Sequence, residues 1–288
     1  MRITDCYTKK KPGLSFEIFP PKHDDYLRDI EETLKILAEL SPDYISVTFG
    51  AGGSMNNSKT IDICRHIKNE YGIEPLVHLT CLNYGKDEID VYLEAMEREG
   101  LKNILALRGD RRPEMPEKKD FPHASDLIAY LKTRGDFCIA GACYPEAHPD
   151  SPDRVSDIRN LKKKVDAGAE VLISQLFFDN NDFYRFREDC RIAGIDVPIT
   201  PGIMPVINKK QIGRMVTMCG ASLPERFAKI LDRYGDLENK NALFDAGMAY
   251  AVSQVIDLLA NGADGIHLYT MNDPRVAKRI AESIRNLI

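Results

Sequence analysis

The stretch Val165–Ile173, "VDAGAEVLI", joins the end of an amphipathic helix pattern to a short apolar run through a single glycine. Glycine commonly ends a helix in an α/β protein, because it adopts the capping backbone conformation without strain. The same order of helix, glycine and apolar run recurs in "EREGLKNIL" (Glu97–Leu105) and "LANGADGIHL" (Leu259–Leu268). This repeated connection predicts parallel strands joined by helical crossovers.

Apolar or β-branched runs recur eight times along the chain, with helical patterns between them. The runs are "LSFEIF", "YISVTF", "PLVHLT", "NILALR", "FCIAGACY", "VLISQLFF", "PITPGI" and "GIHLYT". Amphipathic stretches include Tyr26–Leu40, Ser58–Tyr71, Lys86–Glu99 and Val155–Ala167, with an added helical segment near Pro224–Tyr234. Eight alternations favour a closed (β/α)8 TIM barrel of the α/β class over an open doubly wound sheet. We predict a single domain over residues 1–288.

Bulk composition narrows the class of protein. The chain has 288 residues, 43% hydrophobic and 29% charged, with a net charge of −5. The acidic balance argues against a nucleic-acid partner, which requires a basic surface. We find no apolar run near the length of a membrane span, and "MRITDCYTKKKPG" at the N-terminus lacks the apolar core of a signal peptide. We therefore expect a cytoplasmic protein with no membrane partner.

Cysteine and histidine spacing argues against a metal centre. The seven cysteines form no CxxC pair, and their odd number argues against a disulfide framework. His78, His148 and His267 belong to no HxH or HExxH motif. Neither GxGxxG nor a P-loop is present, so the chain lacks the usual nucleotide-binding loops. We predict no metal site.

Polar residues stand at the C-terminal ends of the predicted strands, where barrel enzymes carry their catalytic groups. In the first run, Glu17 lies on the face opposite Phe16 and Ile18, because side chains alternate along a strand. The apolar faces must meet the helices, so we expect Glu17, Thr48 and His78 to point into the barrel mouth. The run Ile104–Asp110, "ILALRGD", likewise ends in two opposite charges around a glycine.

Seven motifs, in order along nearly the whole chain, resemble those of the methylenetetrahydrofolate reductase family. They are "SFEIFPPK", "YISVTFGAGGS", "HLTC", "ALRGD", "CYPEAHPDS", "NLKKKVDAGAEVLISQLFFD" and "PGIMPV". The resemblance implies a flavin-bearing (β/α)8 barrel of the short, catalytic-domain-only form. It implies reduction of 5,10-methylenetetrahydrofolate to 5-methyltetrahydrofolate by ping-pong hydride transfer through flavin N5. FAD is the implied cofactor and NADH, or NADPH, the implied donor. A homo-oligomer is also implied, and some members take electrons from a partner redox subunit.

The resemblance implies cofactor-binding positions. Arg108 would meet the phosphate and ribitol side of FAD, Gly109 would let the backbone approach, and Asp110 would sit by the isoalloxazine and the pterin. The remaining FAD positions are Thr48, Phe49, Ala51, His78, Ala124, Tyr144, His148, Asp157, Asn160, Lys163 and Lys164. The basic pair Lys163-Lys164 suits a diphosphate.

Catalytic and substrate positions follow from the same resemblance. Glu17 matches the family's general acid, which protonates N10 so that the aminal bridge of the folate opens to a 5-iminium cation. Gln175, Gln211 and Asp110 match substrate contacts. For the glutamate tail, Asp273 stands where an arginine can occur, and Arg275 is two positions later. A pterin contact that is aromatic in the family falls near Met215.

Two other functions stay open at this level. A (β/α)8 lyase or aldolase on a small phosphorylated substrate is one, although no lysine stands inside a strand end for a Schiff base. A non-catalytic flavin-binding assembly subunit is the other. The presence of Glu17, Asp110 and Gln175 together argues against the second.

Overall fold

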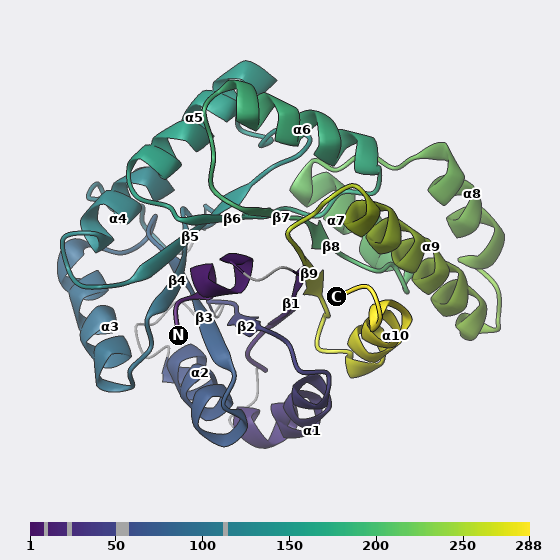
Figure 1. Ribbon diagram of the computed structural model, residues 1–288, viewed down its shortest axis with the longest axis horizontal. Coiled ribbons are helices and arrows are strands. Elements are labelled where there is room, and N and C mark those ends of the chain that lie inside the picture. The colour runs from purple at the N-terminus through teal and green to yellow at the C-terminus, as the bar shows by residue number, and fades with distance from the viewer. Residues whose placement is uncertain (9–10, 22–24, 50–57, 112–114) are drawn as a thin grey trace.

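One parallel sheet, curled into a barrel, organises the molecule. The computed structural model describes residues 1–8, 11–21, 25–49, 58–111 and 115–288. Within these residues, strands form a ring and helices lie around its outside (Figure 1). The sheet order is β7-β6-β5-β4-β3-β2-β1-β9-β8, and every paired strand is parallel. The predicted (β/α)8 class is confirmed.

The elements follow the predicted alternation closely. The strands are β1 (Gly13–Ile18), β2 (Tyr44–Val47), β3 (Glu74–Thr80), β4 (Asn103–Leu107), β5 (Cys138–Cys143), β6 (Val171–Ser174), β7 (Ile199–Thr200), β8 (Gly202–Ile203) and β9 (Gly265–Tyr269). The helices are η1 (Ile3–Thr8), α1 (Tyr26–Glu39), α2 (Ser58–Tyr71), α3 (Lys86–Arg98), α4 (Ala124–Leu131), α5 (Arg154–Asp166), α6 (Asn180–Ile192), α7 (Lys209–Cys219), α8 (Glu225–Tyr234), α9 (Lys240–Ala260) and α10 (Pro274–Ile284).

The seventh strand of the ring is broken, and this break closes the barrel. The run "PITPGI" forms two short strands, β7 paired with β6 and β8 paired with β9. Pro201 stands between them and has no N–H to continue a ladder. Its carbonyl instead accepts the backbone N–H of His267 at 3.0 Å. The two ends of the sheet are thus joined through one residue.

Side chains alternate across the barrel wall as predicted. Phe16 and Ile18 of β1 are fully buried in the main core cluster, which also contains Leu34 of α1 and Ile280 of α10. Burial of this outer apolar layer between sheet and helices is the main source of stability in such a fold. The alternate residues of each strand therefore face the barrel axis.

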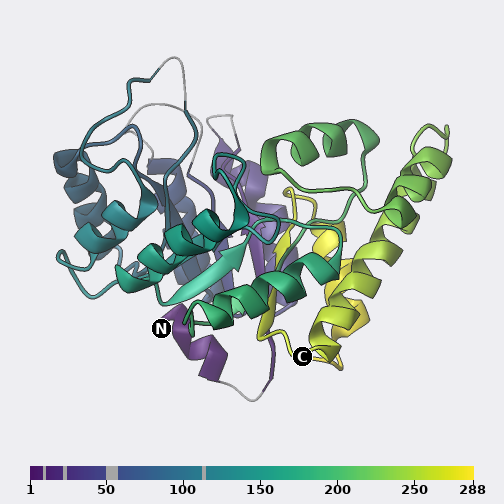
Figure 2. The ribbon, with the colours of Figure 1, turned by 90° about the horizontal axis from the view of Figure 1, so that it is seen from above.

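A short 3-10 helix, η1, closes the end of the barrel where the strands begin. Figure 1 shows it inside the ring of strands, and Figure 2 shows it at the opposite end of the barrel from α7. The Ile3 N–H donates to Asn103 Oδ1 at 2.9 Å, and Arg2 Nη2 lies 2.7 Å from Glu170 Oε2. The plug, residues Ile3–Thr8, therefore leaves the carboxyl ends of the strands as the open end.

Above the plug, the barrel interior changes from apolar to polar. Ile3 and Cys6 pack with Leu76, Leu105 and other strand residues in a separate buried cluster. The next layer is built from hydroxyls: Tyr7 OH lies 2.7 Å from Thr200 Oγ1 and 3.3 Å from Tyr44 OH. Burial raises the pKa of Tyr44 to about 12, so this hydroxyl stays neutral at physiological pH.

Helix α9 differs from the sequence expectation about membrane spans. Asn241–Ala260 is long and apolar enough to cross a membrane by length and composition, and 39% of its most apolar window is buried. The helix packs against α6, α8 and α10. Tyr250 OH and Gln254 Nε2 also donate to the carbonyls of Phe178 and Phe177 at 2.6 and 3.0 Å. These contacts attach α9 to the barrel.

Because the barrel closes tightly at the seventh strand, we expect any side chain at position 202 to destabilise the folded protein strongly. A Cβ on Gly202 would lie 2.2 Å from the Ser174 carbonyl oxygen and 2.7 Å from the Tyr269 hydroxyl. We expect Gly202→Ala to lower the free energy of unfolding by at least about 3 kcal/mol, the upper part of the overpacking range. Urea denaturation measures it.

The matched control is Gly213→Ala in α7, where a Cβ would meet nothing within 4 Å. This change should be stabilising by roughly 0.5–1 kcal/mol, since alanine favours a helix over glycine. Equal effects of the two substitutions would contradict the close approach at Gly202.

Candidate active site

Glu17 lies near the carboxyl end of β1, at the open end of the barrel. Its Oε2 is 3.5 Å from His78 Nε2 on β3 and 3.9 Å from His267 Nε2 on β9. The carboxyl side chain is 22% exposed, whereas the two imidazoles are 6% and 0% exposed. Its backbone is held as well, because Thr270 Oγ1 donates to the Glu17 carbonyl at 2.7 Å. The predicted inward carboxylate is therefore a half-buried acid over two buried histidines.

His78 is a neutral imidazole beside that acid. Burial lowers its pKa to about 4, against the opposing pull of Glu17 and with a further lowering by His267. Its Nε2 is buried and has no hydrogen-bond partner among the described residues. A buried unpaired nitrogen costs free energy and marks a place where a ligand atom can bond.

His267 is a residue of the mouth that the sequence motifs did not indicate, since from the sequence it was considered only as a metal ligand. Its Nδ1 lies 2.8 Å from Ser15 Oγ, and its Nε2 lies 3.4 Å from Ser46 Oγ. The alternation of side chains along a strand could have indicated it. His267 and Tyr269 share one face of β9, as Ser15 and Glu17 share one face of β1.

The segment Arg108-Gly109-Asp110 turns sharply at the end of β4. Gly109 has φ +85°, and a Cβ there would lie 3.0 Å from Thr80 Cβ, so glycine is required. Arg108 Nη2 forms an ion pair with Asp150 Oδ2 at 2.8 Å. Asp110 is exposed at the mouth and lies close enough to raise the pKa of Tyr144, a minor effect beside burial of the phenol.

Tyr144 and His148 form one wall next to Arg108. Their rings are 4.5 Å apart in an edge-to-face arrangement. Burial raises the pKa of Tyr144 to about 12, while burial and then Arg108 lower the pKa of His148. His148 Nδ1 accepts the backbone N–H of Asp150 at 3.0 Å. The same loop thus holds Asp150 against Arg108.

Helix α5 separates the two lysines of the predicted diphosphate pair. Lys164 Nζ points inward and donates to the Ala142 carbonyl at 2.8 Å, and burial lowers its pKa. Lys163 lies on the exposed face, where its Nζ donates to Asn160 Oδ1 at 3.0 Å. Adjacent helical residues point about 100° apart, so one lysine lies on the buried side of α5 and the other on its exposed side. Asp157 is buried and accepts from Ser151 Oγ at 2.8 Å.

Gln175 follows β6, and Tyr269 of β9 is the neighbour of Glu17 in the register of β1 and β9. The Gln175 N–H donates to the Cys143 carbonyl at 2.7 Å, and its Oε1 accepts the N–H of Leu176 at 2.9 Å. The side-chain amide N–H₂ of Gln175 has no protein partner among the described bonds, and this amide is half-buried. Tyr269 OH donates to the Ser174 carbonyl at 2.6 Å, over the space left by Gly202.

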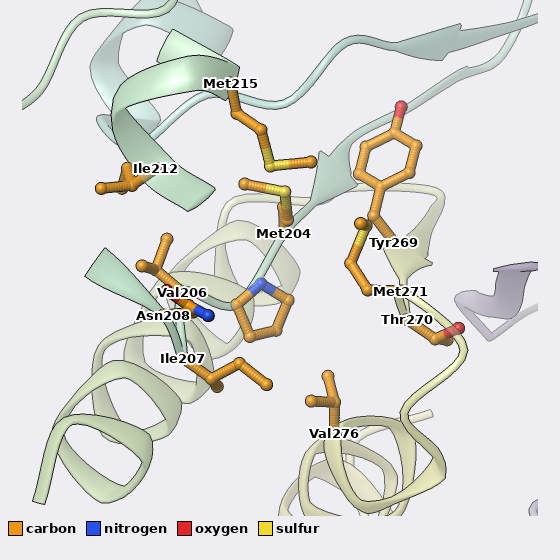
Figure 3. A pocket seen from close by; sticks show the side chains of 11 residues that line it. Met204, Val206, Ile207, Asn208, Ile212, Met215, Tyr269, Thr270, Met271 and Val276 are labelled. Atoms are coloured by element: carbon orange, nitrogen blue, oxygen red, sulfur yellow. The ribbon is translucent and has the colours of Figure 1, made fainter. Parts of the chain in front are cut away.

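An apolar recess adjoins the mouth between α7, α10 and β9 (Figure 3). Three thioethers line it, those of Met204, Met215 and Met271, together with the Tyr269 ring and Val276. Methionine side chains adapt to flat or irregular ligands, and sulfur contacts aromatic rings favourably. Met215, which stands where an aromatic contact was expected, therefore still presents a polarizable surface to this recess.

Other predicted positions lie around the mouth or on its rim. Thr48 follows β2 and is half-buried, and the Phe49 ring packs edge-to-face on Tyr84 and Tyr92. Ala124 is buried at the start of α4. Ala51 lies outside the described residues, as does the side chain of Gln211, whose backbone belongs to α7.

Arg275 is held by Asp273 rather than directed freely at a ligand. Its Nη2 lies 2.6 Å from Asp273 Oδ2, and its side chain is 71% exposed. Asp273 also caps α10 by accepting the Arg275 N–H at 3.0 Å. The pair lies beside Val276 at the edge of the recess.

The described residues contain no group of three or more His, Cys, Asp or Glu that could hold a metal ion. Six of the cysteines are buried and one is half-buried, and each is a free thiol. Burial raises the pKa of the thiols for which a shift is resolved, as in Cys64 and Cys143, which suits inert core residues.

Comparisons with known proteins agree on one family. The family described as "Methylenetetrahydrofolate reductase" matches residues 2–285. The chain is 38% identical to "Methylenetetrahydrofolate reductase (NADH) 1" of Arabidopsis thaliana, over 94% of this chain and 48% of that protein. It is 36% identical to "5,10-methylenetetrahydrofolate reductase" of Escherichia coli K12, over 94% of this chain and 90% of that protein. The chain thus spans about half of the plant relative and most of the bacterial one.

Solved structures with low sequence identity share the fold. A Clostridium thermocellum protein described as binding two copies of 5-methyl-5,6,7,8-tetrahydrofolic acid superposes with a TM-score of 0.65 at 13% identity, over 100% of this chain and 99% of that one. A dihydropteroate synthase from Coxiella burnetii gives 0.51 at 13% identity, over 97% and 94%. These likenesses support the barrel fold.

The buried His78 predicts a specific dependence of stability on pH. Its pKa is about 4 in the folded protein against 6.5 in the unfolded chain, so the unfolded state binds more protons between these values. Stability from this residue is therefore present above pH 6.5 and is lost as the pH falls toward 4. We expect His78→Gln to reduce the pH-dependent loss by about 3 kcal/mol between pH 6.5 and 4.

Urea denaturation of wild type and variant at several pH values measures the difference in slope. Identical slopes for the two proteins would mean that His78 takes up its proton freely in the folded state.

Proposed function

The chain belongs to the methylenetetrahydrofolate reductase family and is an enzyme of that kind, and we propose that it reduces 5,10-methylenetetrahydrofolate to 5-methyltetrahydrofolate with FAD as its cofactor. The observation that carries the proposal is the half-buried Glu17 carboxyl, 3.5 Å from the neutral imidazole of His78 in the barrel mouth. An acid in such a setting can donate a proton to a folate nitrogen.

The residues around the mouth fit a flavin dinucleotide. Gly109 has no side chain, and a Cβ at this position would collide with Thr80. A planar group can therefore approach the backbone there. Arg108 supplies a guanidinium suited to a diphosphate, and His78 Nε2 supplies a buried unpaired nitrogen. Because Arg108 forms an ion pair with Asp150, a bound diphosphate would have to displace the Asp150 carboxylate from the guanidinium. When bound, the flavin would supply two-electron transfer from the reduced donor to the folate.

The protein's own contribution to the chemistry is proton donation. The methylene bridge of the substrate joins N5 and N10 as an aminal, and its N10–C bond breaks only when N10 gains a proton. Glu17 would give that proton as the 5-iminium cation forms, so the O–H bond of the acid breaks and an N10–H bond forms. Asp110, a carboxylate at the mouth, would stabilise the positive charge that develops on the pterin.

Substrate seating would use Gln175 and the recess beside β9. The free amide N–H₂ of Gln175 would bond the pterin or, in the other half-reaction, a nicotinamide. The recess of Met204, Met215 and Met271 would cover the flat p-aminobenzoyl group of the folate. Gln211 and Arg275 are proposed contacts from α7 and α10, the two helices beside this recess.

NADH is the proposed electron donor, a choice supported by the donor printed in the names of the plant relatives. NADPH and a partner redox subunit are the other candidate sources. We further propose a homo-oligomer in the cytoplasm, built from one catalytic domain per chain. The family match and the acid in the mouth favour this enzyme over the lyase and the non-catalytic subunit considered from the sequence.

Binding of FAD should depend on Arg108 and not on its neighbour. We expect Arg108→Gln to weaken FAD binding about 10- to 100-fold, the size of one charge-assisted hydrogen bond. The matched control is Arg111→Gln, since Arg111 is 74% exposed and pairs with Glu117 at 3.0 Å. Titration of the apoprotein with FAD, followed by flavin fluorescence, measures both. Equal weakening by the two changes would indicate a general charge effect.

Glu17 should matter in only one half of the catalytic cycle. Glu17→Gln keeps the size of the side chain but removes the transferable proton. Reduction by NADH requires no protonated folate nitrogen, so we expect its rate to stay near normal. Reoxidation by methylenetetrahydrofolate should fall at least about 10²-fold, the lower end of the effect of a general acid. Anaerobic stopped-flow at the flavin absorbance band follows each half separately. An undiminished reoxidation rate would place the acid elsewhere, and equal slowing of both halves would make Glu17 structural.

A further inference from the structure

Beneath Glu17 lies a buried polar layer that the proposed chemistry does not use. His267, Ser15 and Ser46 are each at most 1% exposed, and they come from β9, β1 and β2. Burying an imidazole and two hydroxyls in a barrel core costs free energy unless each is hydrogen-bonded. An apolar layer of equal volume would satisfy the fold alone, so the arrangement of these groups calls for another reason.

The tautomer of His267 is linked to the protonation of Glu17. The Ser15 hydroxyl has one hydrogen and faces three groups, the Ile266 carbonyl at 3.3 Å, His267 Nδ1 at 2.8 Å and the hydrogen-bonded Tyr44 hydroxyl. A carbonyl can only accept. When Ser15 donates to Ile266 or to the Tyr44 hydroxyl, Nδ1 must carry the proton and donate to Ser15 Oγ. The other ring nitrogen, Nε2, then presents a lone pair toward Glu17 and Ser46.

The two tautomers make opposite demands on the acid. A lone pair on Nε2 can accept the O–H of a protonated Glu17, which favours the neutral acid. A hydrogen on Nε2 would instead donate to Glu17 and favour the carboxylate, which cannot protonate N10. The distance of 3.9 Å from Nε2 to Oε2 is longer than a hydrogen bond, and rotation of Glu17 or one bridging water would close it.

We propose that His267 is a positioning residue for the general acid: Ser15 fixes its Nδ1–H tautomer, and the Nε2 lone pair then orients Glu17 and keeps it protonated. The inference rests on the proposed function of Glu17 as acid. Its new content is the assignment of a proton-holding role to a Ser15–His267 pair inside the barrel.

The groups that face His267 allow this role. His78 on β3 is neutral because burial lowers its pKa to about 4, so it brings no cation beneath the acid. Tyr44 on β2 lies 6.0 Å away and Tyr269 on β9 lies 5.4 Å away, ring centre to ring centre, and burial raises the pKa of both phenols. Glu17 is the acidic group that faces the His267 imidazole. Tyr7 of the plug does not reach the imidazole, because its hydroxyl lies against the Tyr44 hydroxyl.

The first test reads the tautomer directly in the FAD-loaded protein. Imidazole ¹⁵N NMR distinguishes a protonated ring nitrogen from one that carries a lone pair, and His267→Gln identifies the signal by its loss. We expect Nδ1 protonated and Nε2 unprotonated in the wild type at neutral pH. In Ser15→Ala the Nδ1–H state should lose its dominance. A wild-type spectrum with the proton on Nε2 would overturn the proposal, whether or not the enzyme turns over methylenetetrahydrofolate.

The second test reads the acid through the pH dependence of reoxidation. Proton donation needs the protonated acid, so the rate of reoxidation should be highest at low pH and fall as the pH rises. Losing an acceptor for the neutral acid favours the carboxylate. We expect Ser15→Ala and His267→Phe to move the falling limb of the pH–rate profile to lower pH by about one unit. At pH values above the limb, reoxidation should then be about tenfold slower than in the wild type.

His267→Gln, whose amide oxygen can take the place of Nε2, should keep the limb nearer to the wild type. Reduction by NADH should be unchanged in each variant. Tyr7→Phe is the matched control, because it removes a barrel hydroxyl that bonds Thr200 and Tyr44 and has no bond to His267. An unmoved limb in Ser15→Ala, with FAD bound and the fold intact, would overturn the proposal. Absence of folate reduction in the wild type at every pH would instead overturn the proposed function.

Discussion

Closure of the ring at the seventh strand is the constraint on which the site depends. Pro201 breaks the strand, and its carbonyl then takes the backbone N–H of His267, so the ends of the sheet meet. Gly202 leaves room for Tyr269 to cross the mouth and bond the Ser174 carbonyl at 2.6 Å. Because β9 is fixed in this register, His267 lies next to β1 and beneath Glu17. A one-residue slip of β9 would turn His267 and Tyr269 outward into the apolar layer.

The two ends of the barrel are specialised by the residues that fill them. The plug seals the end where strands begin, through ion pairs such as Arg2 with Glu170 and an apolar layer around Ile3 and Cys6. Solvent and ligands are therefore confined to the other end, where the strands finish in polar residues. Between the two ends, hydroxyls of Tyr7, Tyr44 and Thr200 satisfy one another, so the polar character of the mouth extends inward without unpaired charge.

Desolvation, more than ion pairing, sets the chemistry of the mouth. Burial keeps His78 neutral and lowers the pKa of Lys164, while the ion pair Arg108–Asp150 stays on the more exposed side. The acid and its neutral neighbours thus lie apart from the cations that suit a diphosphate. This separation lets one cleft combine proton donation with the binding of an anionic cofactor, since a cation beside Glu17 would favour its ionised form.

The sequence by itself determined the alternation of strands and helices, because the period of apolar residues and the helix-ending glycines are local properties. It also determined which face of β1 carries Glu17, and the family resemblance proposed residues around the mouth without His267. Only the tertiary structure decided that "PITPGI" splits into two strands at Pro201. It also decided that Lys164 bonds a strand carbonyl while Lys163 stays exposed, and that Arg275 pairs with Asp273. These outcomes depend on neighbours distant in sequence. The place of His267 shows the same division: parity along β9 indicates the face, but only the closed ring brings that face against Ser15, Ser46 and Glu17.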